Sequence, residues 1–523
     1  MKYGIYSDNE WLYPDSIVHE HGKKEIRLLA AKGGHAACQI LFNGVEANRP
    51  IEVEIASSGR IACEVYRLID IFVEKNTGPE EFCLKEGELA EGYTTRPAPF
   101  RVYDALKPFG GHEVTDKATE ALYLAFRIDR TTNPGTYHAS VRVTFGEERC
   151  EIPCTLEVFD AEVPSKESLH ISNWFGINNM ASRYGLEKWS EAHWDMIRKY
   201  GVLMRRVRQT HFWIPSELIE ARKNEDGSFS FDFGRIKRFV EMYLELGFTY
   251  IEGNLIAYRV QFKDDHFVVN CCGDVIPALS HEGYDYISQY LKAWRSFLIE
   301  NGWLDITVQH VADEPTEACV GEYRILSGIV RKFMPGTKII EAVEYPEPYD
   351  LDGSVDIWVP KNNLYQEYRE DFERFRRQGD ELWFYTCCVP GGYFLNRLWD
   401  MPLIRTRYLH WGNYIYNLSG YLHWGLNFCA SEEDPFNQRN LFFPPGDTHI
   451  VYPGDDGPWG SMRFEAMRSG IEDYELLKML EKINKPLADE IAACCISSFN
   501  QYNEDTEQFE EARRSLLSAL SEA

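Results

Sequence analysis

The sequence has no long hydrophobic run. None of its 523 residues belongs to a stretch of about 18 apolar residues, the length needed to cross a bilayer. Residues 1–10 also lack the apolar core of a secretory signal. We therefore expect a cytoplasmic protein that is not associated with a membrane.

Basic residues are scarce as well. The chain has 55 Lys and Arg against 82 Asp and Glu, which gives a formal net charge of −27. Such a chain repels the phosphate backbone of nucleic acids and the surface of anionic membranes, so we expect neither as a partner. The net charge does not indicate which other partner the protein has. The sequence also leaves the oligomeric state open.

The cysteines lack the spacing of a zinc site or a disulfide framework. There are 13, an odd number, and several are directly adjacent, as in Cys271 with Cys272, Cys387 with Cys388, and Cys494 with Cys495. We expect reduced and mostly buried thiols, as in a reducing compartment. We expect no metal and no other cofactor.

What the sequence does contain predicts more than one domain, because 523 residues are too many for one ordinary core. Segment 1–164 has short alternating apolar runs separated by turn residues, the pattern of an antiparallel β-sandwich. Residues 160–164 are the expected linker. The predicted strands are 26–29, 38–42, 51–55, 63–69, 122–128, 137–145 and 150–159.

Segment 165–480 alternates strand-like and helix-like stretches, which predicts a parallel sheet. Eight candidate strands indicate a (β/α)8 TIM-type barrel. The barrel should be irregular, because 343–354 is too short and too rich in proline for a full helix. Residues 481–523 predict a short C-terminal helical tail. Helical spacing is clearest in 189–200, 236–244 and 287–298. The strands should begin near Leu169, Leu203, Phe248, Ile306, Lys338, Val355, Leu382 and Gly420.

Two adjacent acids, Asp313 and Glu314, end the fourth predicted strand, and Pro315 marks its opening into a loop. Charged side chains are tolerated there but not inside the strand. The same rim carries the active site in TIM barrels. The pair is either a set of solvated or helix-capping acids, or an acid site for cleaving a bond such as a glycosidic one.

Polar and aromatic residues at the same predicted rim are candidate sugar ligands. Tryptophan can stack on the apolar face of a sugar, whereas tyrosine and asparagine can bind its hydroxyl groups. A place in the core or an ordinary loop is the alternative for each of them. Charged residues at helical spacing in 463–473 predict a structural salt-bridge face instead. The candidates are His310, Tyr385, Tyr393, Asn396, Trp424, Asn427 and Asp447.

These segments together resemble glycoside hydrolase family 123 and the wider group that shares its catalytic domain. The similarity spans roughly 165–480, and a preceding β-sandwich fits the same plan. Most distinctive is the last segment, which begins at Arg463 and ends at Tyr474. The segments are 313–314, 385–392 with its Cys-Cys-Val-Pro-Gly-Gly sequence, 420–427, 446–447, 451–454 and 463–474.

The resemblance implies a retaining exo-β-N-acetylgalactosaminidase that uses the 2-acetamido group of its own substrate. Glu314 would be the general acid and then the base, and Asp313 would hold the acetamido N–H and stabilise an oxazolinium. Two acids this close should also differ in pKa. The expected partner is therefore a glycan or glycoconjugate with a β-linked N-acetylhexosamine.

Two alternatives stay open at this point. The first is a glycosidase for another sugar, in which Glu252, Glu341 or Glu344 acts as a separate nucleophile. The second is a non-catalytic carbohydrate-binding protein on a barrel scaffold. Retention of both Asp313 and Glu314 argues against the second, because a protein that only binds sugar has no need of an acid.

Overall fold

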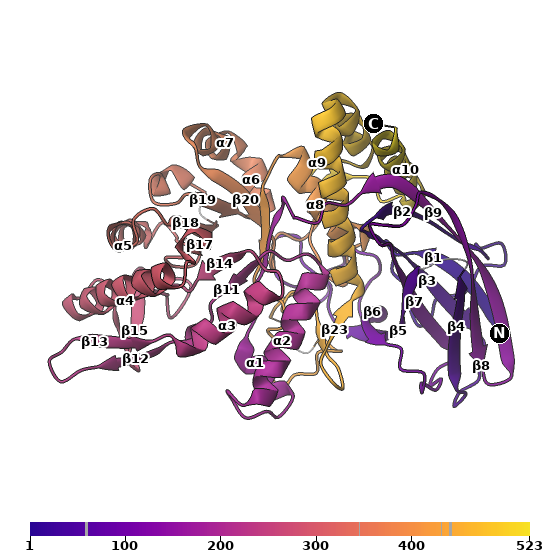
Figure 1. The fold of residues 1–523 in the computed structure, drawn as a ribbon, viewed down its shortest axis with the longest axis horizontal. Helices are drawn as coiled ribbons and strands as arrows, with labels where there is room; N and C mark the ends of the chain where they lie inside the picture. Colours follow the sequence, from indigo (N-terminus) through magenta and orange to yellow (C-terminus); the bar gives the residue numbers. More distant parts are fainter. Residues whose placement is uncertain (58–60, 91, 345, 430, 439–441, 523) are drawn as a thin grey trace.

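A computed structural model describes residues 1–57, 61–90, 92–344, 346–429, 431–438 and 442–522. The N-terminal sheets lie at one end of the molecule and a barrel at the other, with a long C-terminal helix between them (Figure 1). The N-terminal strands are β1 (Lys2–Ser7), β2 (Ile26–Lys32), β3 (His35–Asn43), β4 (Ile51–Ser57), β5 (Ala62–Val73), β6 (Phe100–Pro108), β7 (Thr119–Arg127), β8 (Gly135–Phe145) and β9 (Glu148–Glu162).

All seven predicted N-terminal strands are present, and β1 and β6 are additional. In the described residues these strands form one sheet in the order β1-β3-β7-β5-β6 and another in the order β2-β9-β8-β4. Pairing is antiparallel except between β2 and β9, which run parallel, a departure from the prediction. Apolar side chains of both sheets share one hydrophobic core.

Strand β7 shows why this region is so apolar. Leu122, Leu124 and Phe126 face the core between the two sheets. Ala121 and Tyr123 face a second core, which lies against barrel residues. Because both faces of the strand are covered, it is almost continuously hydrophobic instead of alternating with polar residues.

The barrel strands are all parallel, and their order in the described chain is β10-β21-β20-β19-β18-β17-β14-β11. The ring is nearly closed, because the backbone N–H of Thr210, just before β11, donates to the carbonyl of Ile171 in β10 at 3.1 Å. The strands are β10 (His170–Asn173), β11 (His211–Trp213), β14 (Tyr250–Gly253), β17 (Thr307–Gln309), β18 (Lys338–Val343), β19 (Ile357–Pro360), β20 (Glu381–Tyr385) and β21 (Gly420–His423).

Seven of the eight predicted barrel strands are confirmed, and the one near Leu203 is wrong. Leu203 lies in a helix, and the second strand begins eight residues later, at His211. Ile197, Tyr200 and Met204 continue the buried face of that helix, so the apolar residues around 203 belong to its period. The true strand has only three residues, too few to show a period of its own.

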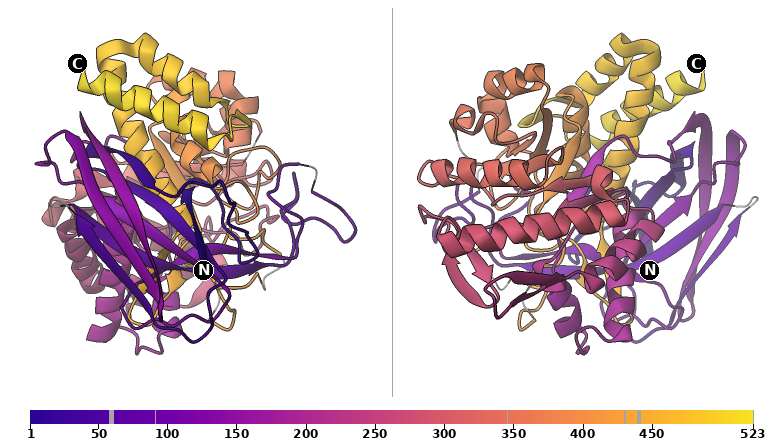
Figure 2. Two further views of the ribbon diagram at one scale, coloured as in Figure 1. Left: turned by 90° about the vertical axis from the view of Figure 1, so that its right-hand side faces the viewer. Right: turned by 60° about the vertical axis from the view of Figure 1, so that its left-hand side comes forward.

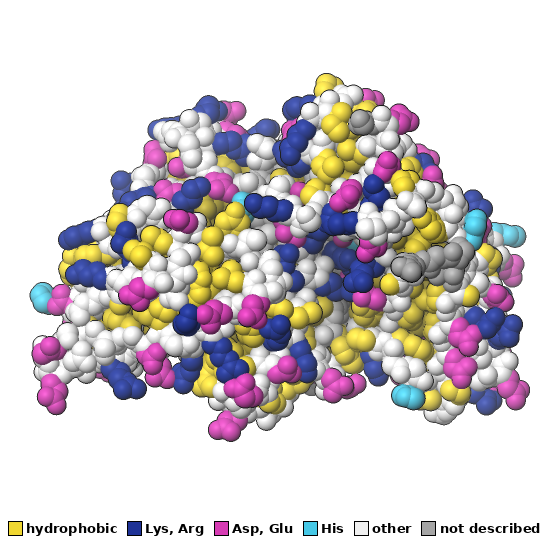
Figure 3. Space-filling model, viewed as in Figure 1, with side chains coloured by type: hydrophobic (Ala, Val, Ile, Leu, Met, Phe, Trp, Pro, Cys, Tyr) yellow, Lys and Arg dark blue, Asp and Glu magenta, His cyan; other side chains and the backbone are white. Residues whose placement is uncertain are grey.

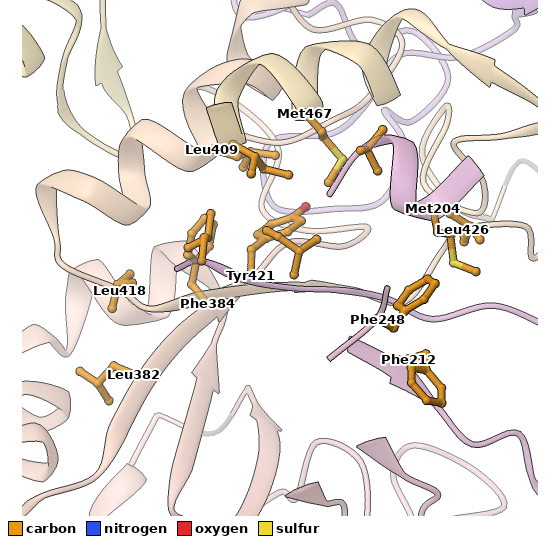
Figure 4. Packing of buried hydrophobic residues seen from close by; sticks show 14 of the residues in the cluster. Met204, Phe212, Phe248, Leu382, Phe384, Leu409, Leu418, Tyr421, Leu426 and Met467 are labelled. Carbon is orange, nitrogen blue, oxygen red and sulfur yellow. The ribbon is translucent and has the colours of Figure 1, made fainter. Parts of the chain in front are cut away.

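Helices surround the barrel, and the three predicted from their spacing are present as α2, α3 and α4. The described part of the irregular connection after β18 contains the 3-10 helix η3 (Pro348–Leu351). Figure 4 shows Phe384 of β20 and Tyr421 of β21 reaching toward the outer helices. The helices are α1 (Ile177–Arg183), α2 (Glu191–Arg206), α3 (Gly234–Glu245), α4 (His281–Glu300), α5 (Val320–Phe333), α6 (Asn362–Glu367), α7 (Arg369–Gln378) and α8 (Ile404–Ile415).

The C-terminal region begins with α9 (Met462–Cys495), which crosses the predicted boundary at 480. It is interrupted at Asn484, two residues before Pro486, because proline cannot continue the hydrogen-bond ladder of a helix. The short hairpin of β24 (Ile496–Ser498) and β25 (Gln501–Tyr502) leads to α10 (Thr506–Ser521). Helix α10 lies beside α9, and its apolar face joins the barrel core (Figure 2).

The predicted boundary at 164 separates segments that pair with each other. Strands β22 (Tyr452–Pro453) and β23 (Pro458–Ser461) come from the barrel segment but extend the N-terminal sheet. Gly460 of β23 is paired with Leu106 of β6 in antiparallel register. The two parts of the chain therefore share a sheet as well as a hydrophobic core.

Acidic and basic side chains are interspersed over the face seen in Figure 3. Within the described chain, none of the helices combines the length and apolar composition that a bilayer crossing requires. All 13 cysteines lie in described residues and are free thiols.

Candidate active site

The adjacent acids lie where the fourth barrel strand opens into a loop. Strand β17 ends at Gln309, and Asp313 and Glu314 follow it as half-buried side chains. Glu314 has a φ of 45°, a left-handed conformation that a residue with a side chain rarely adopts. Neighbours in a regular strand point to opposite faces, and this turn breaks that alternation. Both carboxyl groups can therefore lie at the same rim.

Two side chains from distant segments hold this turn. The hydroxyl of Tyr385, at the end of β20, donates to Oε1 of Glu314. The Nη2 group of Arg259 donates to the backbone carbonyls of Asp313 at 3.1 Å and Glu314 at 2.6 Å. Arg259 thus stabilises the backbone of the pair, whereas Tyr385 contacts the carboxyl group that could transfer a proton.

The surroundings favour the protonated form of both acids. Burial raises the pKa of Asp313 well above its ordinary value, and the charges of Glu314 and Glu341 add to this effect. Burial, followed by the charge of Glu344, raises the pKa of Glu314. The Tyr385 hydrogen bond acts in the opposite direction on Glu314. A carboxyl group that stays protonated near neutral pH can serve as a general acid.

Beneath the pair, His310 joins two fully buried carboxylates. Its Nδ1 is 3.1 Å from Oε1 of Glu341, and its Nε2 is 3.3 Å from Oε2 of Glu252. These contacts outweigh burial and raise the pKa of His310 to about 10, so the ring is an imidazolium at neutral pH. His310 is therefore a buried cation that links β14, β17 and β18.

Glu341 also fixes the backbone that leads to the acids. Its Oε2 accepts hydrogen bonds from the N–H groups of Val311 and Ala312 at 3.0 and 3.1 Å. The hydroxyl of Tyr323 on α5 donates to the same oxygen at 3.1 Å. The side chain of Glu341 is thus occupied by the protein itself, and it positions the segment just before Asp313.

Aromatic rings cover the barrel interior next to the acids. Trp174 and Trp213 are stacked with their centroids 5.1 Å apart, and Trp174 meets His310 edge-on at 5.2 Å. The indole N–H of Trp174 donates to Glu252 at 2.8 Å. Trp424, after β21, belongs to the same hydrophobic cluster as Tyr385. These rings offer apolar faces on which a sugar can stack.

Asp447 is buried beside Trp424. The indole N–H of Trp424 donates to its Oδ2 at 3.2 Å, and Nε2 of His423 lies 3.4 Å from its Oδ1. Burial raises the pKa of Asp447 to about 7, although the charges of Arg397 and Arg463 oppose this. Asp447 thus holds the indole of Trp424 by a hydrogen bond and is itself fully buried.

Two other predicted sugar ligands, Asn396 and Asn427, use their side chains to bind the backbone of the rim loops. The side-chain amide of Asn396 donates to the carbonyls of Cys387 and Pro390, and its oxygen accepts from the N–H of Arg397. Asn427 exchanges two hydrogen bonds with the backbone of Gly176. Their geometry favours positioning of the rim loops over direct contact with a sugar.

Tyr393 lies apart from the residues around the acid pair. It is 54% exposed, and its ring packs against Tyr93 of the N-terminal segment at 6.1 Å. The structure therefore groups Asp313, Glu314, His310, Tyr385, Trp424 and Asp447 around the barrel mouth.

Four residues of this site were not anticipated: Trp174, Trp213, Arg259 and Lys361. Lys361, after β19, forms an ion pair with Glu344, and its charge lowers the pKa of Glu314. Trp174 and Lys361 each follow a barrel strand directly, and this position could have identified them as rim residues. Trp213 lies on the strand that was predicted in the wrong place, and Arg259 lies in a loop without a regular pattern.

Among the described residues, no group of three or more His, Cys, Asp and Glu side chains has an arrangement that could hold a metal ion.

The chain is similar to known proteins in sequence and in fold. The sequence model described as glycoside hydrolase 123, catalytic domain, matches residues 174–480. A family 123 glycoside hydrolase from Clostridium perfringens has a similar structure, with a TM-score of 0.76 and 16% identity over 100% of this chain and 98% of that one. A search of curated protein sequences gives no significant match.

Two xylanases of glycoside hydrolase family 10 are more distant, each with a TM-score of 0.34. The first, from termite gut, contains a bacterial Ig-like domain. It is 12% identical to this protein, and the match covers 70% of this chain and 91% of the xylanase chain. The other, from Clostridium thermocellum, is 9% identical over 89% and 94%.

The family match begins at Trp174, runs through the acid pair and ends in α9. It therefore contains the rim residues described above. It also spans more than half of the chain, and the solved relative matches along nearly its whole length. These findings favour an enzyme over a protein that only binds sugar. The chain belongs to glycoside hydrolase family 123, and it is a glycosidase.

Proposed function

We propose that the protein is a retaining exo-β-N-acetylgalactosaminidase that cleaves its substrate with the help of the sugar's own 2-acetamido group. The observation that carries this proposal is the acid pair at one rim, with the other candidate carboxylates held by protein groups. The carboxylate of Glu341 has four polar contacts within the protein. Glu252 accepts a hydrogen bond from the indole of Trp174. Glu344 forms an ion pair with Lys361.

In the first step Glu314 donates its proton to the glycosidic oxygen while the acetamido oxygen attacks the anomeric carbon. The bond between that carbon and the leaving oxygen breaks, and a cyclic oxazolinium forms. In the second step Glu314, now ionised, removes a proton from water, which attacks the same carbon and opens the ring. Two inversions at one carbon give net retention.

Asp313 would accept a hydrogen bond from the acetamido N–H and stabilise the positive charge of the oxazolinium. This role requires an ionised carboxylate, whereas burial favours the protonated form. The cationic intermediate offsets that preference, because a positive charge close to a carboxylate lowers its pKa. The nearby His310 imidazolium acts in the same direction.

The substrate is expected to be a glycan or glycoconjugate with this sugar at its end. The relative from Clostridium perfringens is described as a hydrolase of glycolipid glycans. That description supports a carbohydrate joined to a larger group. The stacked pair Trp174 and Trp213, together with Trp424, would hold the ring of the terminal sugar.

The proposal is tested by hydrolysis of the p-nitrophenyl β-glycosides of N-acetylgalactosamine, N-acetylglucosamine, galactose and glucose. The enzyme forms are wild type, Glu314→Gln, Asp313→Asn and the control Glu317→Gln, at an exposed acid in the same loop. We expect activity on the acetamido sugars alone, its loss in the first two variants, and its retention in the control.

Activity on galactose or glucose would contradict substrate assistance. The separate-nucleophile alternative would then be favoured, and Glu252 would be the first candidate, because its Oε1 has no hydrogen-bond partner among the described residues. Full activity of Asp313→Asn would likewise contradict the assigned role of Asp313.

A further inference from the structure

Two neighbouring thiols meet at the mouth of the barrel. Cys387 and Cys388 lie just after β20, and their Sγ atoms are 3.8 Å apart. Both are free thiols, and Cys388 is partly exposed whereas Cys387 is buried. No step of the proposed mechanism uses either of them. The site therefore carries a reactive pair of groups in addition to its acids.

The pair lies among residues of the candidate active site. Both cysteines pack in the same hydrophobic cluster as Tyr385 and Trp424. Tyr385 stands two residues before Cys387 and donates to the carboxyl group of Glu314. A change in the two thiols therefore acts on the backbone that carries a hydrogen-bond partner of the proposed acid.

The surroundings assign different roles to the two sulfur atoms. Contact with Cys388, followed by burial, raises the pKa of Cys387 well above its ordinary value, and the charges of Glu314 and Asp447 add to this effect. The Sγ group of Cys387 also donates to the carbonyl of Val389 at 3.2 Å. Cys387 is thus held as a thiol, and the partly exposed Cys388 is the thiol that a small oxidant meets first.

The two other pairs of adjacent cysteines lie outside this cluster. Cys271 ends β15 (Val268–Cys271), and Cys272 follows it in a turn. Cys494 and Cys495 end α9, where neighbouring side chains do not face each other, and of these two only Cys494 is exposed. These pairs share the sequence pattern but not the position at the barrel mouth, so they provide controls.

We propose that Cys387 and Cys388 form an oxidation site, at which a hydroperoxide closes a disulfide between the two neighbours and reversibly lowers the activity of the glycosidase. This site requires only that the chain hydrolyses a glycoside. It does not depend on which sugar is cleaved or on the role of Asp313.

The reaction proceeds in two steps. The Cys388 thiol loses its proton, and its sulfur attacks one oxygen of hydrogen peroxide. An S–O bond forms, the O–O bond breaks, and the departing hydroxide takes up the proton as water. The Cys387 sulfur then attacks the sulfur of this sulfenic acid, so that an S–S bond forms, the S–O bond breaks, and hydroxide leaves with the Cys387 proton as a second water. Two thiols lose two electrons, and one peroxide gains them.

The disulfide that results should be easily reduced. The Cα atoms of adjacent residues are about 3.8 Å apart, whereas those of ordinary disulfides are separated by at least about 4.4 Å. A ring between neighbours is therefore strained, and strained disulfides are the labile ones that other thiols reopen. This property makes the modification reversible.

Closure of the ring should also disturb the acid site. The two Sγ atoms must approach from 3.8 Å to about 2.05 Å. The peptide group between the cysteines becomes part of the ring, and its carbonyl now accepts a hydrogen bond from Asn396 at 2.7 Å. Strain in this peptide acts on the segment that begins at Tyr385, and it draws the tyrosine hydroxyl away from Glu314.

The first experiment treats the wild-type enzyme with a small molar excess of hydrogen peroxide and then blocks the remaining thiols with an alkylating reagent. Mass mapping should show that the peptide with Cys387 and Cys388 has lost two hydrogen atoms and carries no alkyl group. Hydrolysis of the p-nitrophenyl glycoside that the enzyme cleaves best should fall by about tenfold or more, because small displacements in a catalytic site are costly. Dithiothreitol should restore both the mass and the activity.

Serine variants identify the thiols that are responsible. The activity of Cys388→Ser and of Cys387→Ser, whatever its level before treatment, should not change with peroxide. Cys272→Ser and Cys494→Ser interrupt the control pairs, so both should lose activity in peroxide as wild type does.

A trivalent arsenical gives a second test that needs no oxidant. Phenylarsine oxide binds two close thiols together: its arsenic forms two As–S bonds, and its oxygen leaves as water with the two thiol protons. It should inhibit wild type and Cys272→Ser but not Cys388→Ser. A small dithiol should reverse the inhibition more effectively than a monothiol, because it offers arsenic the same attachment at two points.

Several results would overturn the oxidation site. One is a peptide that keeps its mass in peroxide or gains oxygen instead of losing hydrogen. Another is a disulfide between Cys387 and Cys388 that leaves hydrolysis unchanged. Equal loss of activity in Cys388→Ser and wild type would show that oxidation acts elsewhere in the chain. None of these results bears on which glycoside the enzyme prefers, so the proposed function is tested separately.

Discussion

The hydroxyl of Tyr385 donates a hydrogen bond to Oε1 of Glu314, and so joins the end of the seventh barrel strand to the acid after the fourth. This bond lowers the pKa of Glu314, as does the charge of Lys361, whereas burial and the charge of Glu344 raise it. The protonation of the proposed acid therefore depends on groups from several strands.

Substitution of these neighbours should shift the pH dependence of catalysis in opposite directions. A general acid must be protonated, so kcat/KM falls as pH rises through its pKa. Tyr385→Phe removes a group that lowers the pKa of Glu314, so the alkaline limb should move up. Glu344→Gln removes a group that raises the pKa, so the limb should move down. Profiles for the p-nitrophenyl substrate measure both shifts, and two shifts of the same sign would contradict the assignment of Glu314.

His310 should be essential for stability. Replacement by Gln leaves the buried carboxylates of Glu252 and Glu341 without their cation, and we expect a loss of about 3–5 kcal/mol in the free energy of unfolding. Denaturant titration measures it. His281→Gln, at a histidine that is 95% exposed, is the control and should change stability by less than about 0.5 kcal/mol.

The contribution of His310 should also depend on pH. Its pKa is about 10 in the folded protein and 6.5 ordinarily. The folded state therefore binds the extra proton between these values, so this stabilisation is complete below about pH 6.5 and is lost as pH rises toward 10. A stability difference between wild type and His310→Gln that stays constant over this interval would contradict a buried imidazolium.

Asp447 should show a pH dependence in the same direction, but over a lower pH range. Its pKa rises from an ordinary 3.8 to about 7 on folding, so wild type loses stability as pH rises between these values. Asp447→Asn lacks this effect. Its stability relative to wild type should therefore increase by up to about 4 kcal/mol from pH 4 to 7 and then stay level. Asp455→Asn, at an exposed acid nearby, should show no such trend in denaturant titrations at several pH values.

The left-handed turn at Glu314 should be measurable as strain. At a φ of 45° a β-carbon is unfavourable, so Glu314→Gly should be more stable than Glu314→Ala by about 1 kcal/mol. The same pair at Glu317 should give the reverse order, because glycine there only adds freedom to the unfolded chain. Thermal unfolding of the four variants tests this. Equal stability at position 314 would mean that the turn stores no strain.

Sequence periodicity predicted most of the barrel because buried parallel strands are continuous apolar runs with turn residues between them. It failed at β11, whose three residues are too short to show a period, and the apolar end of α2 was taken for that strand. Periodicity also did not predict that β22 and β23 join the N-terminal sheet. Strands of two and four residues are too short for their sequence to indicate which distant strand they pair with.

At the site, Asp313 and Glu314 were found because Pro315 marks the end of an apolar strand. The salt-bridge face predicted on α9 is confirmed, for Glu465 pairs with Arg206 and Asp473 with Arg407. By contrast, nothing local distinguishes Trp174 from a core tryptophan. The contacts of Glu341 with Val311 and Ala312 depend on the register of β17 and β18, which no single segment contains.

The N-terminal sheets and the barrel should unfold together. Asp104, on β6, is fully buried and accepts hydrogen bonds from Arg463, Trp399 and Tyr452, all from the barrel segment. Because β23 also pairs with β6, neither part can separate without exposing buried charge and unpaired backbone. Calorimetry should therefore show one transition. Arg463→Met should lower its midpoint and cost about 3–5 kcal/mol, since Asp104 then keeps no buried cation beside it. Two resolved transitions in wild type, with only the later one affected by the substitution, would show instead that the N-terminal sheets are an independent domain.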